Sequence, residues 1–295
     1  MHERDWNRLV QQLRDGECTP FIGAGAGAGT LPTGRRLASD FAQEYRYPFA
    51  DSDNLARVMQ FVAAEVGDPV SLKRELARRI EQHQPPDFNV LNEPHGLLAS
   101  LPLPLYLTTN YDSFMTKALH WHQRPGSPAI CRWHPEIPGD PPQPALNPQV
   151  GAPLVFHLHG ATSKPASMVL TDDDYLNFML TLALDEGFDG RRVIPSSILP
   201  ALATMPLLFI GYSLQDWTFR LLFHGFRRLL SGFNQRRHVS IQLMEPLSDD
   251  TEATRTRATE YLVQYFDHRN ISVYWGDAGS FCTELRKRLG SGYAV

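Results

Sequence analysis

Four short motifs hold the residue types in this sequence that could do chemistry. In chain order they are a glycine-alanine string that begins Gly23-Ala24-Gly25 and runs to Leu31-Pro32, then Thr109-Asn110-Tyr111-Asp112, His159-Gly160 and Gly211-Tyr212-Ser213. Each motif follows a short apolar run that is typical of a buried strand. Glycine amides bind phosphate, and histidine exchanges protons near neutral pH. The motifs therefore indicate binding of a phosphate-bearing ligand with acid–base chemistry beside it.

The glycine string suits phosphate best. Glycine lets the backbone approach a diphosphate closely, and the following helix directs its positive N-terminal end at the same place. A Walker A motif is excluded because no Gly-Lys-Ser/Thr follows. A nicotinamide dehydrogenase fits poorly, because no Asp or Glu stands about 20 residues on at the end of a second strand. A flexible glycine turn is the alternative, and the position between strand and helix favours nucleotide binding over it.

The other three motifs have structural alternatives. Asp112 could simply cap the next helix, and Ser213 could do the same after its own strand. His159 could be a buried structural histidine, although its place beside Gly160 at a strand end suits acid–base chemistry, with an ordinary pKa near about 6.5. No acidic partner suggests a metal site around the histidines, so no metal is expected.

Hydrophobic periodicity predicts strands alternating with helices. The expected strands cover 18–22, 103–109, 155–159, 207–210, 239–244 and 271–275, with a further short strand possible at 129–133. Helical spacing dominates 51–100, which we interpret as a small helical insertion. Residues 125–153 are rich in proline and are expected to form a long loop of the kind used as a lid, binding loop or oligomer contact. The pattern predicts an α/β fold, Rossmann-like, whose mostly parallel sheet carries helices on both faces.

Composition narrows the function classes. The chain has 295 residues and a formal charge of −4, which argues against a general nucleic-acid binder, and no direct sequence-specific nucleic-acid binding is expected. Its three cysteines are too few and too dispersed for a four-cysteine zinc module, and they fit a reducing compartment. No apolar run of about 18 residues and no signal peptide is evident. We therefore expect a cytoplasmic protein without membrane contact.

Taken together and in this order, the four motifs resemble those of the sirtuin fold, specifically its prokaryotic branch of sirtuin-like NAD hydrolases in antiphage defence. The resemblance covers about 19–245. It implies one domain, 1–295, in which 18–50 and 101–295 form the NAD-binding core and 51–100 the insertion. The family commonly has serine where this chain has Gly27, and glycine where it has Thr30. The zinc module of the deacylating members cannot be built here.

The resemblance also implies roles for individual residues. Asn110 would orient the ribose hydroxyls and the attacking water, His159 would accept a proton, and Asp112 would act near the nicotinamide. The cofactor-binding residues would be those that cradle the diphosphate or hold the adenosine side, namely Gly23, Ala24, Gly25, Leu31, Pro32, Thr109, Asn110, Gly211, Ser213 and Glu245.

The function that the resemblance implies is hydrolysis of NAD, the substrate, to nicotinamide and ADP-ribose, as an NAD-depleting effector of abortive antiphage defence. Such an enzyme has to stay silent in healthy cells. A homo-oligomer and a separate sensor protein, of the DNA-translocase ATPase or Argonaute-like type, are therefore expected partners. The alternatives are an NAD-dependent deacylase or ADP-ribosyltransferase, and a non-catalytic module that binds NAD or ADP-ribose.

Overall fold

A single parallel sheet organises the chain. The computed structural model describes residues 1–135, 137, 146–184, 193–212, 220, 236–243 and 251–290. Within these ranges seven strands form one sheet in the order β3-β4-β2-β1-β5-β6-β7, and every pairing is parallel. The strands are β1 (Thr19–Ile22), β2 (Leu105–Thr108), β3 (Ser127–Ile130), β4 (Leu154–His157), β5 (Leu207–Ile210), β6 (His238–Gln242) and β7 (Ile271–Trp275). The predicted α/β class is confirmed.

Most strands are buried along their whole length, as expected when helices cover both faces of a parallel sheet. The exceptions are the two edge strands, β7, which is half-buried over its last three residues, and β3, which contains Pro128. Proline cannot donate a hydrogen bond to a neighbouring strand, so it is tolerated at an edge. The proline-rich segment thus contributes a strand at 127–130, close to the one anticipated at 129–133.

Two helical layers cover the sheet. On one face α1, α5, α6 and α11 pack against alternate strand residues such as Ile22 and Leu208. On the other face α7, α8 and α10 pack against the intervening residues such as Phe21 and Phe209. Their bounds are α1 (Glu3–Arg14), α5 (Pro94–Ser100), α6 (Phe114–Trp121), α7 (Asp172–Leu184), α8 (Leu199–Thr204), α10 (Glu252–Asp267) and α11 (Ala278–Leu289). Helical spacing of apolar residues predicts a further helix at 214–230, but this segment lies outside the described residues, apart from Arg220.

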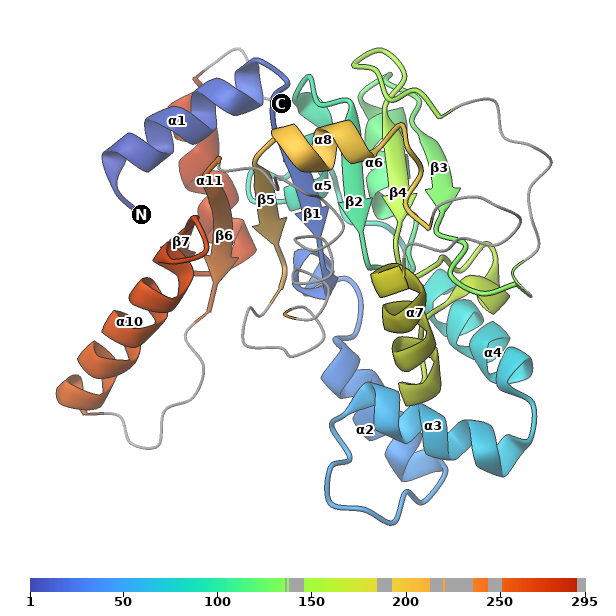
Figure 1. Cartoon of the computed structure of the whole chain (residues 1–295). Coiled ribbons are helices and arrows are strands. Elements are labelled where there is room, and N and C mark those ends of the chain that lie inside the picture. Colours follow the sequence, from blue (N-terminus) through green and yellow to red (C-terminus); the bar gives the residue numbers. More distant parts are fainter. Residues whose placement is uncertain are drawn as a thin grey trace.

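A separate helical cluster lies beyond the carboxyl ends of the strands (Figure 1). It consists of α2 (Gly34–Glu44), α3 (Leu55–Val66) and α4 (Pro69–Glu81), which share a core of their own around Phe41, Met59 and Leu76. This packing unit does not coincide with 51–100. Helix α2 belongs to it because its apolar stripe faces α3, whereas α5 packs on the sheet.

Two short 3₁₀ turns and several side-chain caps occur in the described segments that connect the strands and helices. The 3₁₀ turns are η1 (Ala24–Gly27) and η2 (Pro165–Ser167). In the helical cluster each helix has a side chain that accepts a free amide of its first turn: Thr33 caps α2, Asn54 caps α3 and Asp68 caps α4. The local sequence therefore determines where the helices of the cluster begin.

Candidate active site

A cavity of about 480 Å³ opens at the point in the sheet where the order of the strands along the chain reverses. From β1 the chain builds the sheet outward through β2 on one side and later through β5 on the other, and ligands of such folds bind at this switch point. Segments that follow β1, β2, β4 and β5 line the cavity, together with α2 and the start of α3. The lining residues used below are Ala24, Leu31, Pro32, Arg35, Asp53, Thr109, Asn110, Tyr111, Asp112, His159, Tyr175, Gly211 and Tyr212.

The glycine loop after β1 is held against the loop after β5. The amide of Gly23 donates to Ile210 O at 2.8 Å, and the amide of Gly25 donates to Gly211 O at 2.9 Å. Those two amides are therefore engaged by the protein itself. Of the expected diphosphate cradle, Ala24 is the residue that lines the cavity, while Gly23 and Gly25 provide the close approach of the two loops.

The mouth of the cavity is framed by the residues that follow the glycine loop. Leu31 and Pro32 line the cavity, and their expected role in cofactor binding stays a prediction. Arg35 lies on the first turn of α2, and its Nε is 3.7 Å from Oδ2 of Asp53. Both residues line the cavity, and both side chains are well exposed. An ion pair this exposed contributes little to stability, so the Arg35 guanidinium is free to meet an anionic ligand.

Asn110 is oriented by three hydrogen bonds. Its amide nitrogen Nδ2 donates to Gly23 O at 3.1 Å, and its backbone amide donates to Thr108 Oγ1 at 3.0 Å. His157 Nδ1 donates to the Asn110 carbonyl oxygen at 3.1 Å. Burial lowers the pKa of His157, which therefore stays a neutral donor. These contacts leave the side-chain oxygen of Asn110 available to the cavity that the residue lines.

Asp112 makes the capping contact considered for it and also lines the cavity. Its Oδ1 accepts the Phe114 amide at 2.8 Å at the start of α6, which is a capping contact. The residue is nevertheless buried and lines the cavity. Its carboxylate thus places a negative charge beside Asn110, where it would stabilise positive charge that develops on a ligand.

His159 lies just beyond β4, with its ring against two aromatic side chains. The ring centroid is 5.4 Å from that of Tyr175 and 4.9 Å from that of Phe178, in both cases edge to face. Among the residues that the structure describes, neither ring nitrogen has a hydrogen-bond partner. Burial lowers the pKa of His159 from 6.5 to about 3. The expected pKa near 6.5 is therefore wrong, because an enclosed imidazole without a counter-charge loses the stabilisation that water gives its charged form.

Three tyrosines that line the cavity, Tyr111, Tyr175 and Tyr212, were not among the predicted site residues. Tyr212 Oη donates to Ile22 O at 2.9 Å and lies 2.7 Å from Thr109 Oγ1, so it joins the ends of three neighbouring strands. Tyr175 lines the cavity and packs on His159. Tyr212 belongs to the Gly-Tyr-Ser motif and could have been found there. Tyr175 follows the acidic segment Asp172–Asp174, but its contact with His159 depends on how α7 packs.

The remaining predictions concern residues that the structure does not describe, or groups that it lacks. Ser213 and Glu245, expected at the adenosine side, lie outside the described residues, so their roles stay predictions. No group of three or more His, Cys, Asp or Glu side chains that could hold a metal ion occurs within the described ranges. A search of the same ranges finds no helix long and apolar enough to cross a membrane.

A doubly covered parallel sheet that brings a glycine loop, an Asn-x-Asp motif and a His-Gly motif to one cavity defines a Rossmann-type ligand-binding domain. The family model described as SIR2-like domain matches residues 104–271, which is more than half of the sequence. The chain belongs to the SIR2-like domain family, and the resemblance to sirtuin-like proteins is confirmed.

Curated relatives add names to this family assignment. The chain is 26% identical over 235 residues to "NAD(+) hydrolase ThsA" of Enterococcus faecium, which covers 79% of this chain and 45% of that protein. It is 23% identical over 295 residues to the protein of the same name from Acinetobacter baumannii (strain 532279), covering 96% and 56%. The chain spans about half the length of the curated relatives that it matches.

One solved structure, described as "Structural Basis for the Mechanism and Regulation of Sir2 Enzymes", aligns with 97% of this chain and 99% of its own. The sequence identity is 13% and the TM-score is 0.38. The fold assignment rests on the sheet order and on the family match.

Proposed function

We propose that this chain hydrolyses the bond between nicotinamide and ribose in NAD. One observation carries the proposal: Asn110, Asp112 and His159, whose ring nitrogens have no hydrogen-bond partner within the described ranges, line a single cavity at the switch point of the sheet. Pure binding of a diphosphate requires none of these three side chains. The family assignment and relatives named as NAD(+) hydrolases support the same reaction.

The chemistry follows from the charges around the cavity. As the C–N glycosidic bond breaks, the bonding electrons leave with nicotinamide and positive charge builds on the ribose. The Asp112 carboxylate stabilises that charge, and Asn110 orients the ribose hydroxyls and the attacking water. A water oxygen bonds to the ribose carbon and releases one proton. His159, neutral because of its burial, accepts that proton and passes it to solvent, since its low pKa disfavours keeping it.

The biological setting is part of the proposal. An enzyme that depletes NAD suits abortive antiphage defence, in the cytoplasm where its substrate is found. Control would come from self-assembly or from a separate sensor, of the DNA-translocase ATPase or Argonaute-like type. The expected homo-oligomer belongs to the same proposal, and size-exclusion chromatography with light scattering, before and after adding NAD, measures it directly.

The decisive assay is chromatography of nicotinamide and ADP-ribose released from NAD, by the chain alone and with its candidate partner. Asn110→Ala and His159→Ala should each lower nicotinamide release by about 100-fold or more, since each removes a group that acts on the reacting atoms. Asn7→Ala and His120→Ala change exposed residues on α1 and α6 and serve as matched controls. Undiminished release by Asn110→Ala would exclude this site.

The alternative activities give different products in the same assay. Nicotinamide release that requires an acyl-lysine peptide or an acceptor protein would indicate deacylation or ADP-ribosylation. Intact NAD that binds in calorimetry but is never cleaved, with the partner present, would indicate a binding module. A cyclic product in place of ADP-ribose would change the product and leave the site assignment intact.

A further inference from the structure

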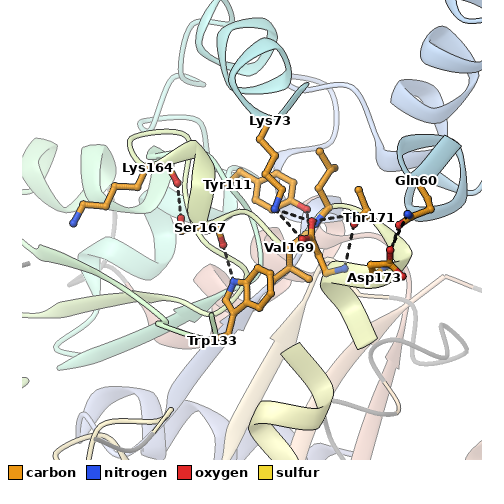
Figure 2. A network of polar contacts seen from close by, with 11 residues as sticks. Gln60, Lys73, Tyr111, Trp133, Lys164, Ser167, Val169, Thr171 and Asp173 are labelled. Atoms are coloured by element: carbon orange, nitrogen blue, oxygen red, sulfur yellow. Dashed lines mark hydrogen bonds and ion pairs between the residues drawn. The ribbon is translucent and has the colours of Figure 1, made fainter. Parts of the chain in front are cut away.

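Lys73 is a buried lysine outside the cavity, and nothing in the proposed reaction uses it. It lies on α4 in the helical cluster, and its side chain is 8% exposed. Its Nζ is 2.9 Å from Asp174 on α7, whose side chain is 15% exposed, and 5.5 Å from the centre of the Trp133 ring. Figure 2 shows Lys73 reaching from its helix into a polar network below it. A lysine is rarely buried unless its charge is paired.

The carboxylate that Lys73 meets also determines where α7 begins. Asp174 Oδ2 accepts the backbone amides of Leu170 at 2.9 Å and Thr171 at 3.0 Å. In return Thr171 Oγ1 accepts the Asp174 amide at 3.1 Å, which completes a reciprocal capping box. The first turn of α7 and the charge of Lys73 are therefore held by one side chain.

A second contact joins the helical cluster to the same turn. Gln60 on α3 donates from Nε2 to Asp173 Oδ2 at 2.9 Å and accepts the Asp173 amide at 3.1 Å, as Figure 2 also shows. Two neighbouring residues at the start of α7 are thus bound to two different helices of the cluster. The position of α7 depends on the cluster and not only on the sheet.

The residues that follow on α7 hold the His159 ring. Tyr175 and Phe178 lie three positions apart, on one side of the helix, and both present an edge-to-face contact to the imidazole. Histidines that act as bases are usually oriented by a hydrogen bond to a third group. His159 has no such bond within the described residues, so packing against α7 orients its ring.

Hydrogen bonds also connect the segment before α7 with the loop that bears Asn110. The Tyr111 hydroxyl donates to Val169 O, and the amide of Val169 donates to His159 O at 2.9 Å. Movement at the start of α7 would therefore reach both the Asn110 loop and the His159 backbone.

We propose that Lys73 is a positioning residue: through Asp174 and α7 it holds the His159 ring in the orientation required for catalysis. The effect that we expect on the rate of nicotinamide release rests on the proposed function. It makes the helical cluster part of the catalytic apparatus, because a residue of α4 determines the geometry of a base beyond β4.

Kinetics of Lys73→Met form the first half of the test, since methionine keeps the length of the side chain and removes its charge. We expect kcat for nicotinamide release to fall about tenfold while KM for NAD stays within about twofold, because ring orientation affects the reacting atoms more than binding. Lys73→Arg should recover at least half of the activity. Arg74→Met, which removes an exposed charge from the adjacent position of α4, is the matched control.

The second half of the test measures the NMR resonance of the His159 ring and does not depend on enzyme activity. In protein labelled with ¹³C at histidine Cε1, the His159 resonance is identified by its loss in His159→Gln. It should shift in Lys73→Met, because the ring moves relative to Tyr175 and Phe178, and stay in place in Arg74→Met. If wild-type protein releases no nicotinamide, the proposed function fails, and this resonance still decides the positioning role.

An unmoved His159 resonance in folded Lys73→Met overturns the proposal, whatever happens to the rate. Should Lys73→Met not fold, Asp174→Asn replaces it, because asparagine keeps an oxygen for the capping contacts but removes the charge that attracts Lys73. The same shift, or its absence, then decides the question.

Discussion

A β-carbon on Gly211 would lie 2.5 Å from the carbonyl oxygen of Gly23, a distance that no side chain tolerates. A side chain at Gly23 is blocked in the same way, since its β-carbon would lie 2.7 Å from Gly211 O. The loops after β1 and β5 therefore meet as bare backbone. This approach lets the amides of Gly23 and Gly25 bond across the gap, and it places Ala24 at the cavity wall.

Gly211→Ala should abolish nicotinamide release and destabilise the fold. Gly211 has φ +81°, a conformation strained for alanine, and the new β-carbon would also lie 2.3 Å from Ala26 N. We expect the free energy of unfolding to fall by about 3 kcal/mol in urea titrations. Gly151→Ala is the control, since its β-carbon would meet nothing within 4 Å. Equal stability of the two variants would contradict this account of the loop contact.

Tyr212→Phe should weaken NAD binding more than it weakens the fold. The substitution removes the hydroxyl that joins Thr109 to Ile22 O and keeps the ring contact with Phe21. We expect a loss of about 1–2 kcal/mol in the free energy of unfolding, and a rise of several-fold in the KM for NAD as Thr109 loses its orientation. Tyr261→Phe changes a tyrosine that is 62% exposed and should alter neither quantity.

The pH dependence should show no histidine transition near neutrality. Because the pKa of His159 is lowered from 6.5 to about 3, the base stays neutral above about pH 4. The profile of kcat/KM should therefore lack an inflection between pH 6 and 7 due to this residue. An inflection there, displaced by conservative changes next to His159, would show that the ring is hydrated.

The same pKa gives a stability prediction with a definite sign. Below pH 6.5 the unfolded chain binds a proton at His159 that the folded chain does not, so the free energy of unfolding falls as the pH drops toward 3. His159→Gln removes this contribution. Chemical denaturation at pH 7 and pH 5 should show a smaller loss of stability in the variant than in the wild type.

Arg124→Met should destabilise the segment that leads into β2. The guanidinium donates to the carbonyl oxygens of Ala99 at 2.8 Å, and of Leu103 and Val150 at 2.9 Å each. Removing these charge-assisted bonds should lower the free energy of unfolding by about 2–3 kcal/mol. Lys117→Met, an exposed substitution on the adjacent helix α6, should change it by less than about 0.5 kcal/mol.

The sequence by itself determined the class of fold and several of the residues that line the cavity, Asn110, Asp112 and His159 among them. Apolar runs that end in polar motifs predict strand ends, and parallel strands bring those ends to one edge whatever the details of packing. For this reason the sequence alone predicts that Asn110, Asp112 and His159 lie at one edge of the sheet. The structure shows that local side chains, Thr33, Asn54 and Asp68, cap the three helices of the cluster.

Only the tertiary structure decided the environment of those residues. The lowered pKa of His159 comes from burial against Tyr175 and Phe178, and burial is a property of the assembled chain. Unlike the predicted insertion at 51–100, the helical cluster includes α2 and excludes α5, because each helix packs where its apolar face is covered. The pairing of Lys73 with Asp174 joins positions 101 residues apart. No local pattern encodes such a contact, since long-range packing alone brings the two side chains together.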